Sequence, residues 1–371
     1  MSDSEIRNPR RRPAYRGKQR SPRLRAPEPC PHDEEALNER LSRPTQDVVD
    51  CLSCTEGDIV VLGVGGKMGP TLAVMARRAL DQNEDKRRVL GVARFSDPAV
   101  RAYLEANGVE TVACDLLDPN AVAQLPRAPN VIYMAGQKFG TTDAPERTWA
   151  MNALVPAYVA AHYAGARIVV FSTGCVYPAT PVSRGGSQEE DALEPLGEYA
   201  NSCVARERIF DFYSHRDGTK VVHFRLNYAI DLRYGVLLDI ARKVRNGTPI
   251  DLTTGHVNVI WQRDANAWAL QCLLLATSPP EPRRALNITG PETISVRAVA
   301  QEFGRLLRCE PQFTGREAET ALLSNAHLAF AFFGYPTVPL AQMIYWVVEW
   351  LEIQGKTLDK PTHFEVRDGS Y

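Results

Sequence analysis

The sequence lacks the features of membrane, secreted and nucleic-acid-binding proteins. No uninterrupted apolar run approaches the roughly 20 residues that a membrane-spanning helix needs, so we expect no integral membrane protein. The opening Met-Ser-Asp-Ser-Glu has no apolar core, which argues against a secretory signal. Cysteine is scarce, at 8 of 371 residues, so we expect reduced thiols and a cytoplasmic protein. The net charge of -1 gives no reason to expect nucleic acid as the main partner.

The charge is nevertheless concentrated at the N-terminus. Residues 1–26 contain nine Arg or Lys and two acids, which gives about +7 there and, because the whole chain carries -1, about -8 elsewhere. The segment has almost no apolar residues and cannot bury enough surface to offset its ordering entropy. We therefore expect residues 1–45 to form a disordered basic arm, with nucleic-acid binding as a minor alternative.

Four residues in and after this arm are of the types that zinc prefers. Cys51 and Cys54 have the two-residue gap of a zinc hairpin, but a zinc site needs a second pair at a suitable spacing. Cys30 and His32 are separated by one residue, which is too tight. We expect unpaired thiols and no metal site.

From residue 57 onward, short apolar runs alternate with helical segments. The runs expected as strands are 58–62, 88–92, 111–114, 131–134, 167–171 and 220–225. The segments expected as helices between them are 68–80, 98–107, 120–124, 147–164 and 197–214. Such alternation is typical of parallel β-α-β units, and continuously apolar runs fit strands buried on both faces. The sequence predicts an α/β fold, a Rossmann-type doubly wound parallel sheet.

A glycine loop follows the first expected strand. In Gly63-Val-Gly-Gly66-Lys67-Met68-Gly69, the first glycine can make the sharp turn that leaves the strand. The second lets the backbone approach a pyrophosphate, and the third lets the helix pack on the strand with its N-terminus facing the anion. We expect this loop to bind a dinucleotide; a tight turn without a ligand is the alternative.

The end of the second expected strand bears on which dinucleotide binds. An NAD enzyme usually carries Asp or Glu there, to accept hydrogen bonds from the ribose hydroxyls. This chain has Gly-Val-Ala-Arg94-Phe-Ser96 and no acid. Arg94 and Ser96 would suit a 2'-phosphate, so NADP is favoured over NAD, unless Arg94 is an ordinary surface residue.

Taken together, these segments resemble the extended short-chain dehydrogenase/reductases, the NAD(P)-dependent epimerase/dehydratase family. The resemblance covers roughly residues 57–352 and implies a Rossmann domain over 57–230, a smaller C-terminal substrate domain over 231–352 that crosses back to the sheet, and a tail over 353–371. The segments that carry it are the glycine loop, Cys114-Asp-Leu116, Met134-Ala-Gly136, Asn152, Phe171-Ser-Thr-Gly-Cys-Val-Tyr177, Tyr199, Asn246–Ile250, Val257–Asp264, Leu286–Glu292 and Ser295–Leu307.

The resemblance also implies roles for single residues. Asp115 would accept from the adenine amino group, Leu116 would lie beside the ring, and Ala135 and Gly136 would line the cofactor. Thr173 would hydrogen-bond the reacting substrate oxygen. Tyr199 would be the general acid/base. Each also has a structural alternative, as a turn residue, a strand-end hydroxyl or a surface aromatic.

The chain departs from the family pattern at one position. The family motif is Tyr-x-x-x-Lys, but here it reads Tyr199-Ala-Asn-Ser-Cys203. A lysine there lowers the tyrosine pKa by roughly 2–3 units, which a neutral thiol cannot do. Three interpretations stay open: the site is redox-dead, another cation substitutes, or Tyr199 only donates a hydrogen bond. Lys138, two residues past Gly136, is the best substitute, if it is not simply a solvent-facing lysine.

Segments near and beyond residue 230 would form the substrate site. The candidate contacts are Asn227, Tyr228, Arg233, Tyr234, Trp261 and Gln262. Residues 336–351 read as a C-terminal amphipathic helix. Helix 147–164 is apolar around much of its circumference, and with helix 197–214 it would form the homodimer interface that is common in the family.

Two functions remain open at this point. The first is an NAD(P)-dependent oxidoreductase or epimerase that acts on a hydroxyl or keto group of a carbohydrate or nucleotide-sugar-like small molecule. The second is a catalytically weak nucleotide-binding regulatory or scaffold protein of the same fold, which Cys203 would favour.

Overall fold

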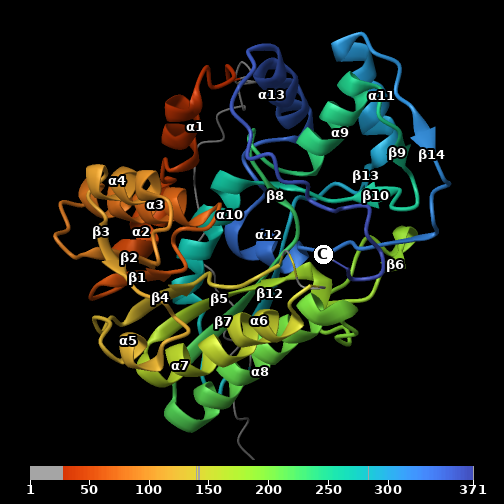
Figure 1. Ribbon diagram of the computed structural model, residues 1–371. Coiled ribbons are helices and arrows are strands. Elements are labelled where there is room, and N and C mark those ends of the chain that lie inside the picture. The colour runs from red at the N-terminus through yellow and green to blue at the C-terminus, as the bar shows by residue number, and fades with distance from the viewer. Residues whose placement is uncertain (1–27, 139, 141–142, 283, 371) are drawn as a thin grey trace, which may run out of the picture.

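A seven-stranded sheet forms the centre of the protein (Figure 1). The computed structural model describes residues 28–138, 140, 143–282 and 284–370. All six strand pairings in the sheet are parallel. The strands are β1 (Ile59–Leu62), β2 (Val89–Ala93), β3 (Glu110–Ala113), β4 (Asn130–Tyr133), β5 (Arg167–Thr173), β7 (Lys220–Leu226) and β12 (Arg284–Ile288). The first six are the predicted strands, and β12 adds a seventh where the chain crosses back from the C-terminal part.

The strand order is β12-β7-β5-β4-β1-β2-β3. β1 pairs with β2 on one side and with β4 on the other, so the winding direction reverses between β1 and β4. In open α/β sheets, ligands bind beyond the carboxyl ends of the strands at this reversal. The predicted Rossmann-type doubly wound fold is confirmed.

Helices cover both faces of the sheet, each over its own apolar cluster (Figure 1). One face carries α2 (Gln46–Ser53), α3 (Gly69–Gln82) and α10 (Gln262–Gln271), with α4 (Pro98–Ala106) next to α3. The other carries α5 (Pro119–Ala123), α6 (Pro145–Trp149), α7 (Val155–His162) and α8 (Gly197–Asp217). A π-helical turn, η1 (Ala150–Leu154), interrupts the helix predicted over 147–164. Pro156 follows it, and because proline has no N–H the regular bonding pattern cannot continue there.

The C-terminal part has a second apolar core, between α9 (Val236–Asn246), α11 (Val296–Leu307) and α13 (Leu340–Glu352). We call this part the lid. α12 (His327–Phe333) packs on β12 and joins the apolar cluster of the sheet face that carries α3 and α10. The short 3-10 turns are η2 (Gly174–Val176), η3 (Val182–Arg184) and η4 (Cys272–Leu274). The strands outside the central sheet form four two-residue pairs: β6 (Thr180–Pro181) with β15 (Thr320–Ala321), β8 (Ala229–Ile230) with β11 (Ile260–Trp261), β9 (Ile250–Asp251) with β14 (Phe313–Thr314), and β10 (His256–Val257) with β13 (Ile294–Ser295).

The prediction of a disordered arm is wrong for residues 28–45. They include helix α1 (Glu34–Leu41), whose N-terminus is capped by the Asp33 carboxylate. Leu37 and Leu41 are fully buried in the lid core, because they lie four residues apart on one helical face. The strongly basic residues 1–27 lie outside the described part of the chain.

The predicted tail has neither helix nor strand over residues 353–370, but it is packed against the protein. Thr362 and Phe364 are buried. The Thr362 backbone N–H and hydroxyl donate to Asp239 of α9 at 2.8 and 2.6 Å. Gly369 lies against Gly197, so closely that neither position has room for a side chain. The segment therefore runs from the lid to the N-terminus of α8.

Within the described residues, no helix is long and apolar enough to cross a membrane. In the same part of the chain, no three His, Cys, Asp or Glu side chains gather as metal ligands would. Cys30 and Cys51 each have a backbone carbonyl as the neighbour of the sulfur, from Trp346 and Leu270 respectively, and all eight cysteines are free thiols.

Candidate active site

The glycine loop after β1 is defined by close backbone contacts. Gly63 has a φ of +81°, and a Cβ there would lie 2.6 Å from the backbone nitrogen of Ala135. Gly69 lies against the backbone of Val64 without room for a side chain. α3 has no side-chain N-cap, so its first N–H groups face the loop without an acceptor from a capping side chain. These features form a cradle that fits the diphosphate of a dinucleotide.

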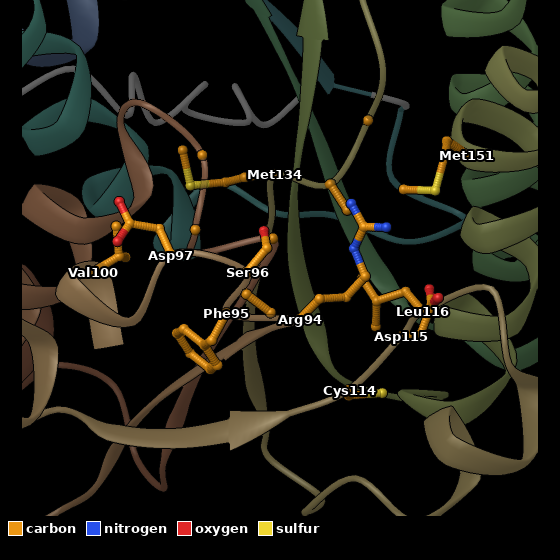
Figure 2. A pocket seen from close by; sticks show the side chains of 16 residues that line it. Arg94, Phe95, Ser96, Asp97, Val100, Cys114, Asp115, Leu116, Met134 and Met151 are labelled. Atoms are coloured by element: carbon orange, nitrogen blue, oxygen red, sulfur yellow. The ribbon is translucent and has the colours of Figure 1, made fainter. Parts of the chain in front are cut away.

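A first pocket, a cavity of about 270 Å³, lies beyond β1, β2 and β4. In Figure 2, Phe95, Ser96, Asp97 and Val100 lie on one side, Asp115 and Leu116 lie on the other, and the Arg94 side chain extends toward Asp115 and Leu116. It contains all the residues expected around the adenosine and the glycine loop except Lys67, Met68 and Gly69. Its lining is Gly63, Gly65, Gly66, Ala93, Arg94, Phe95, Ser96, Asp97, Val100, Cys114, Asp115, Leu116, Met134, Ala135, Gly136 and Met151.

Asp115, expected to contact the adenine, and Asp97, near the end of β2, both accept backbone hydrogen bonds. Asp115 accepts a hydrogen bond from the backbone of Leu117 at 3.1 Å, so it also has the turn role given as its alternative. Asp97 is the first acid after β2, and its carboxylate caps α4 by accepting from Ala99. Arg94 and Ser96 are therefore the pocket residues that could meet a phosphate on the ribose.

A second pocket of about 270 Å³ lies between the glycine loop, the end of β5 and the lid. It shares Gly63, Gly66 and Met134 with the first pocket, so the two meet across the glycine loop. The lining that matters for chemistry is Lys67, Lys138, Thr173, Cys175, Tyr199, Asn227, Tyr228, Tyr234 and Thr362.

Thr173 and Tyr199 are brought together in this second pocket. Thr173 ends β5, Tyr199 lies in the first turn of α8, and their side chains are hydrogen-bonded. Cys203 is fully buried one turn further along α8. Burial raises the pKa of Tyr199 well above 10, and the neighbouring thiols of Cys203 and Cys175 add to this effect. Tyr199 therefore carries its proton at neutral pH.

Two lysines face the same pocket. The Lys138 ammonium lies 5.9 Å from the centre of the Tyr199 ring. The Lys67 ammonium donates to the Ala229 carbonyl at 2.7 Å and lies 4.5 Å from the centre of the Tyr234 ring. Burial lowers the pKa of Lys67 to about 8. Lys67 thus connects the glycine loop to the lid.

Sequence reasoning did not single out Arg206, a third cation near Tyr199. Its side chain is buried, and its guanidinium donates to the Phe171 carbonyl at 2.8 Å and to Asn152 Oδ1 at 2.6 Å. The signal in the sequence was its spacing, because a residue seven positions after Tyr199 lies on the same face of a helix.

The expected substrate contacts separate into two groups. Asn227, Tyr228 and Tyr234 line the second pocket. Tyr228 has a φ of +47°, which is unusual for an aromatic residue and points to a constrained backbone at this wall.

Arg233, Trp261 and Gln262 do not line the second pocket, contrary to the expectation. The Arg233 guanidinium is bonded to Asp231 and Glu34 at 2.8 and 3.1 Å. Trp261 is fully buried against Trp346 in the lid core. Gln262 donates to the Thr71 hydroxyl at 3.1 Å between α10 and α3. These side chains are held by packing within the fold.

A third pocket, of about 260 Å³, adjoins the second through Cys175 and Tyr228. The C-terminal segment supplies much of its wall, with Phe364, Val366, Arg367 and Gly369. The rest comes from residues 177–179, Glu194, Leu196, Thr254 and Leu322. This role could not be predicted from the sequence, because the segment has no periodicity and is placed by its contacts with α9 and α8.

The fold and the glycine loop define the class as a Rossmann-type α/β protein with a cleft along the carboxyl edge of its sheet. Residues 59–248, about half of the chain, match the NAD dependent epimerase/dehydratase family. The protein belongs to that family. A comparison with curated protein sequences finds no match.

Solved structures of similar fold are numerous. WbmG of Bordetella bronchiseptica, in complex with NAD and UDP, is 16% identical with a TM-score of 0.65 over 83% of this chain and 99% of that one. UDP-glucose 4-epimerase of Thermotoga maritima, with UDP-glucose, is 16% identical with a TM-score of 0.63 over 80% and 99%. MoeE5, in complex with UDP-glucose and NAD, is 19% identical with a TM-score of 0.62 over 80% and 99%. At such identities the likeness concerns the fold.

Proposed function

We propose that this protein is an NAD(P)-dependent oxidoreductase or epimerase that acts on a hydroxyl or keto group of a carbohydrate or nucleotide sugar. The observation that carries the proposal is one continuous cleft. Its first pocket ends in the glycine loop, and its second pocket holds the hydrogen-bonded Thr173 and Tyr199 side chains. Residues suited to a dinucleotide and residues suited to a substrate oxygen therefore line joined cavities.

NADP is the favoured cofactor and NAD the alternative. Arg94 and Ser96 line the first pocket where an NAD enzyme would carry an acid, and a guanidinium suits a phosphate better than a hydroxyl pair. The NAD complexes of WbmG and MoeE5 support the alternative. When bound, either dinucleotide would supply hydride chemistry at the substrate carbon.

The protonation state of Tyr199 indicates how it would meet the substrate oxygen. A tyrosine whose pKa lies well above 10 stays protonated at neutral pH, so it can donate a hydrogen bond but is a weak proton donor unless a nearby cation lowers that pKa. Tyr199 would donate to the substrate oxygen, and Thr173 would orient that oxygen.

The nucleotide-sugar class is supported by the shape of the cleft beyond Tyr199. The third pocket continues the second past Cys175 and Tyr228, which gives room for a substrate larger than a monosaccharide. UDP-glucose bound to MoeE5 and to the Thermotoga epimerase supports the same class.

A homodimer through α6–α7 and α8 is also part of the proposal. Large apolar side chains are exposed on these helices, with exposed fractions of 39% for Trp149, 46% for Leu154 and 58% for Phe212. A second copy of the same surface would cover them.

The rival function, a catalytically weak nucleotide-binding protein, is favoured by the buried Cys203. In both cases the glycine loop binds nucleotide, and the rival differs only in turnover. One experiment therefore serves both: fluorescence titration with NADPH and NADH, followed by turnover with keto and hydroxyl forms of UDP-sugars.

The expected result is submicromolar to micromolar NADPH binding and turnover that Tyr199→Phe abolishes. Arg94→Ala should weaken NADPH binding by about 10–100-fold with little effect on NADH, because one charge-assisted hydrogen bond is lost. Arg101→Ala, on the exposed side of α4, is the matched control. Binding without turnover would favour the rival, and no binding of either dinucleotide would refute both.

A further inference from the structure

Arg206 is a buried cation without a carboxylate partner. Its side chain is 5% exposed, and two of its nitrogens donate to Phe171 and Asn152, while Nε has no hydrogen-bond partner. None of the ion pairs among the described residues includes it, because the adjacent Glu207 is bonded to Arg225 instead. Burying a cation without a carboxylate in direct contact is costly, so Arg206 calls for a compensating role.

The guanidinium lies under the part of the cleft where the cofactor is expected. A Cβ on Gly136 would be 2.5 Å from Arg206 Nη2 and 3.0 Å from Asn152 Oδ1. The Arg206 guanidinium is also 5.8 Å from the centre of the Tyr133 ring, at the end of β4. Because helix side chains lean toward the N-terminus, Arg206 reaches back along α8 toward Cys203 and Tyr199.

We propose that Arg206 is the positioning residue that supplies the positive charge of the absent Tyr-x-x-x-Lys lysine to Tyr199. Residues 199, 203 and 206 are spaced by four and three, so their side chains share one face of α8. In the family, the positive charge is on a lysine one turn after the tyrosine. Here it would be on Arg206, two turns after Tyr199, whose side chain is long enough to reach back.

Arg206 is also linked to the loop after β4 indirectly, through Asn152. The Asn152 amide accepts from the Gln137 backbone N–H and donates to the Gln137 carbonyl, both at 2.9 Å. Arg206 holds the oxygen of the same amide. The loop that carries Lys138 past the end of β4 is therefore fixed to α8 through this pair.

The groups around Tyr199 determine how strongly Arg206 acts. Cys203 and Arg206 face it from α8, Cys175 from η2, Thr173 from β5 and Lys138 from the loop after β4. Burial and the two thiols raise the pKa of Tyr199, whereas the Arg206 charge lowers it. The same charge opposes the effect of burial on Cys203, whose pKa is raised to about 11.

The test measures ionisation of Tyr199 directly, without cofactor or substrate. Protein labelled with ¹³C at tyrosine Cζ is titrated by NMR, and the Tyr199 signal is identified by its loss in Tyr199→Phe. Because the wild-type tyrosine ionises above the accessible range, Cys203→Lys serves as the background, in which a new lysine should bring the pKa below about 10. Arg206→Met in that background should raise it again by on the order of one unit.

Two controls separate charge from structure. Arg206→Lys keeps the charge and should leave the Tyr199 pKa within about 0.3 unit, as should Arg208→Met, which removes an exposed cation from the same helix. If Arg206→Met does not fold, Gly136→Ala, whose Cβ would displace the guanidinium, gives the same test. A shift below 0.3 unit refutes the proposal, and so does a Tyr199 that stays protonated through pH 10.5 in Cys203→Lys.

A second arm rests on the proposed function and uses turnover. Arg206→Met should lower turnover at pH 8 by about 10-fold or more, and Cys203→Lys/Arg206→Met should recover most of it, because the cation returns to the family position. Failure to recover, in a variant that still binds NADPH, counts against the proposal. Absence of turnover in the wild type would instead refute the proposed function and leave the NMR result decisive for Arg206.

Discussion

The buried ion pair beneath the active site offers a sharp test of how the site is held together. Glu207 and Arg225 are fully buried and joined by two hydrogen bonds, of 2.9 and 2.8 Å. The Glu207 carboxylate also accepts from the Ser172 hydroxyl at 2.7 Å, which ties α8 to β5 directly before Thr173. We predict that Glu207→Gln strongly destabilises the protein.

The magnitude follows from the pKa of Glu207. Burial alone would raise it, but the charge of His223 and the hydrogen bonds and charge of Arg225 outweigh burial and lower it from 4.5 to about 2. A difference of roughly 2.5 units corresponds to about 3 kcal/mol. This agrees with the roughly 3–5 kcal/mol expected when one partner of a buried pair is removed.

The assay is urea unfolding of wild type and Glu207→Gln at several pH values. Because the folded-state pKa is depressed, the stabilisation is complete above about pH 5.5 and is lost as pH falls toward 2. The difference between the two proteins should therefore be about 3 kcal/mol at pH 7 and shrink steadily below pH 4.5. Glu105→Gln, which breaks the exposed pair with Arg101, should change little at any pH.

Two results would refute the reasoning. A difference below about 1 kcal/mol at pH 7 would mean that the pair contributes no more than an exposed one. A difference that stays constant between pH 7 and pH 3 would mean that the Glu207 charge is not its source. Glu207→Leu/Arg225→Met should recover much of the lost stability, since removal of both charges leaves neither one unpaired.

Three further predictions concern the cleft and the dimer. Lys138→Ala distinguishes Lys138 from Arg206 as the source of the missing positive charge. If Arg206 supplies it, NADPH affinity in Lys138→Ala should stay within about twofold of wild type; a loss of affinity and turnover on the order of 10²-fold, partly rescued by Cys203→Lys, would instead assign the charge to Lys138. NADPH affinity should fall several-fold between pH 7 and pH 9, because Lys67 loses its charge as pH rises through about 8, and Lys67→Met should remove that dependence. Phe212→Glu should give a monomer by sedimentation at micromolar concentration. Tyr335→Glu, next to α12 on the opposite face of the sheet, should not, and a monomeric wild type would refute the dimer.

The sheet could be predicted because buried strands consist of apolar residues, which are visible in the sequence. The inner parallel strands are covered on both faces, so runs such as Ile59–Leu62 are apolar at every position, whereas the edge strand β3 has no buried residue. Helix α1 was missed because it is short and highly charged, and its stability comes from two leucines that reach a distant core. The Asp33 cap followed by Leu37 and Leu41 was the available signal.

The site was predictable where position follows from the strand ends and not where it depends on packing between distant segments. Thr173 and the glycine loop are placed by β5 and β1 themselves. Trp261 and Gln262 have side chains that suit sugar binding, but the contacts of α10 with α3 and of the lid core bury both. Residue type alone does not separate a binding aromatic from a core aromatic.

The environment of Tyr199 shows why a motif is an incomplete guide to a catalytic charge. Tyr-x-x-x-Lys describes one helical turn, but the field at a phenol depends on every charge within several ångströms in a poorly solvated site. Such a charge can come from any side chain that reaches the same space, and a helix offers two turns of one face for it. Loss of a lysine at position 203 therefore predicts loss of activity only if no cation stands within reach. Arg206, which is buried and outside the ion pairs of the described residues, is the cation that we propose for this role.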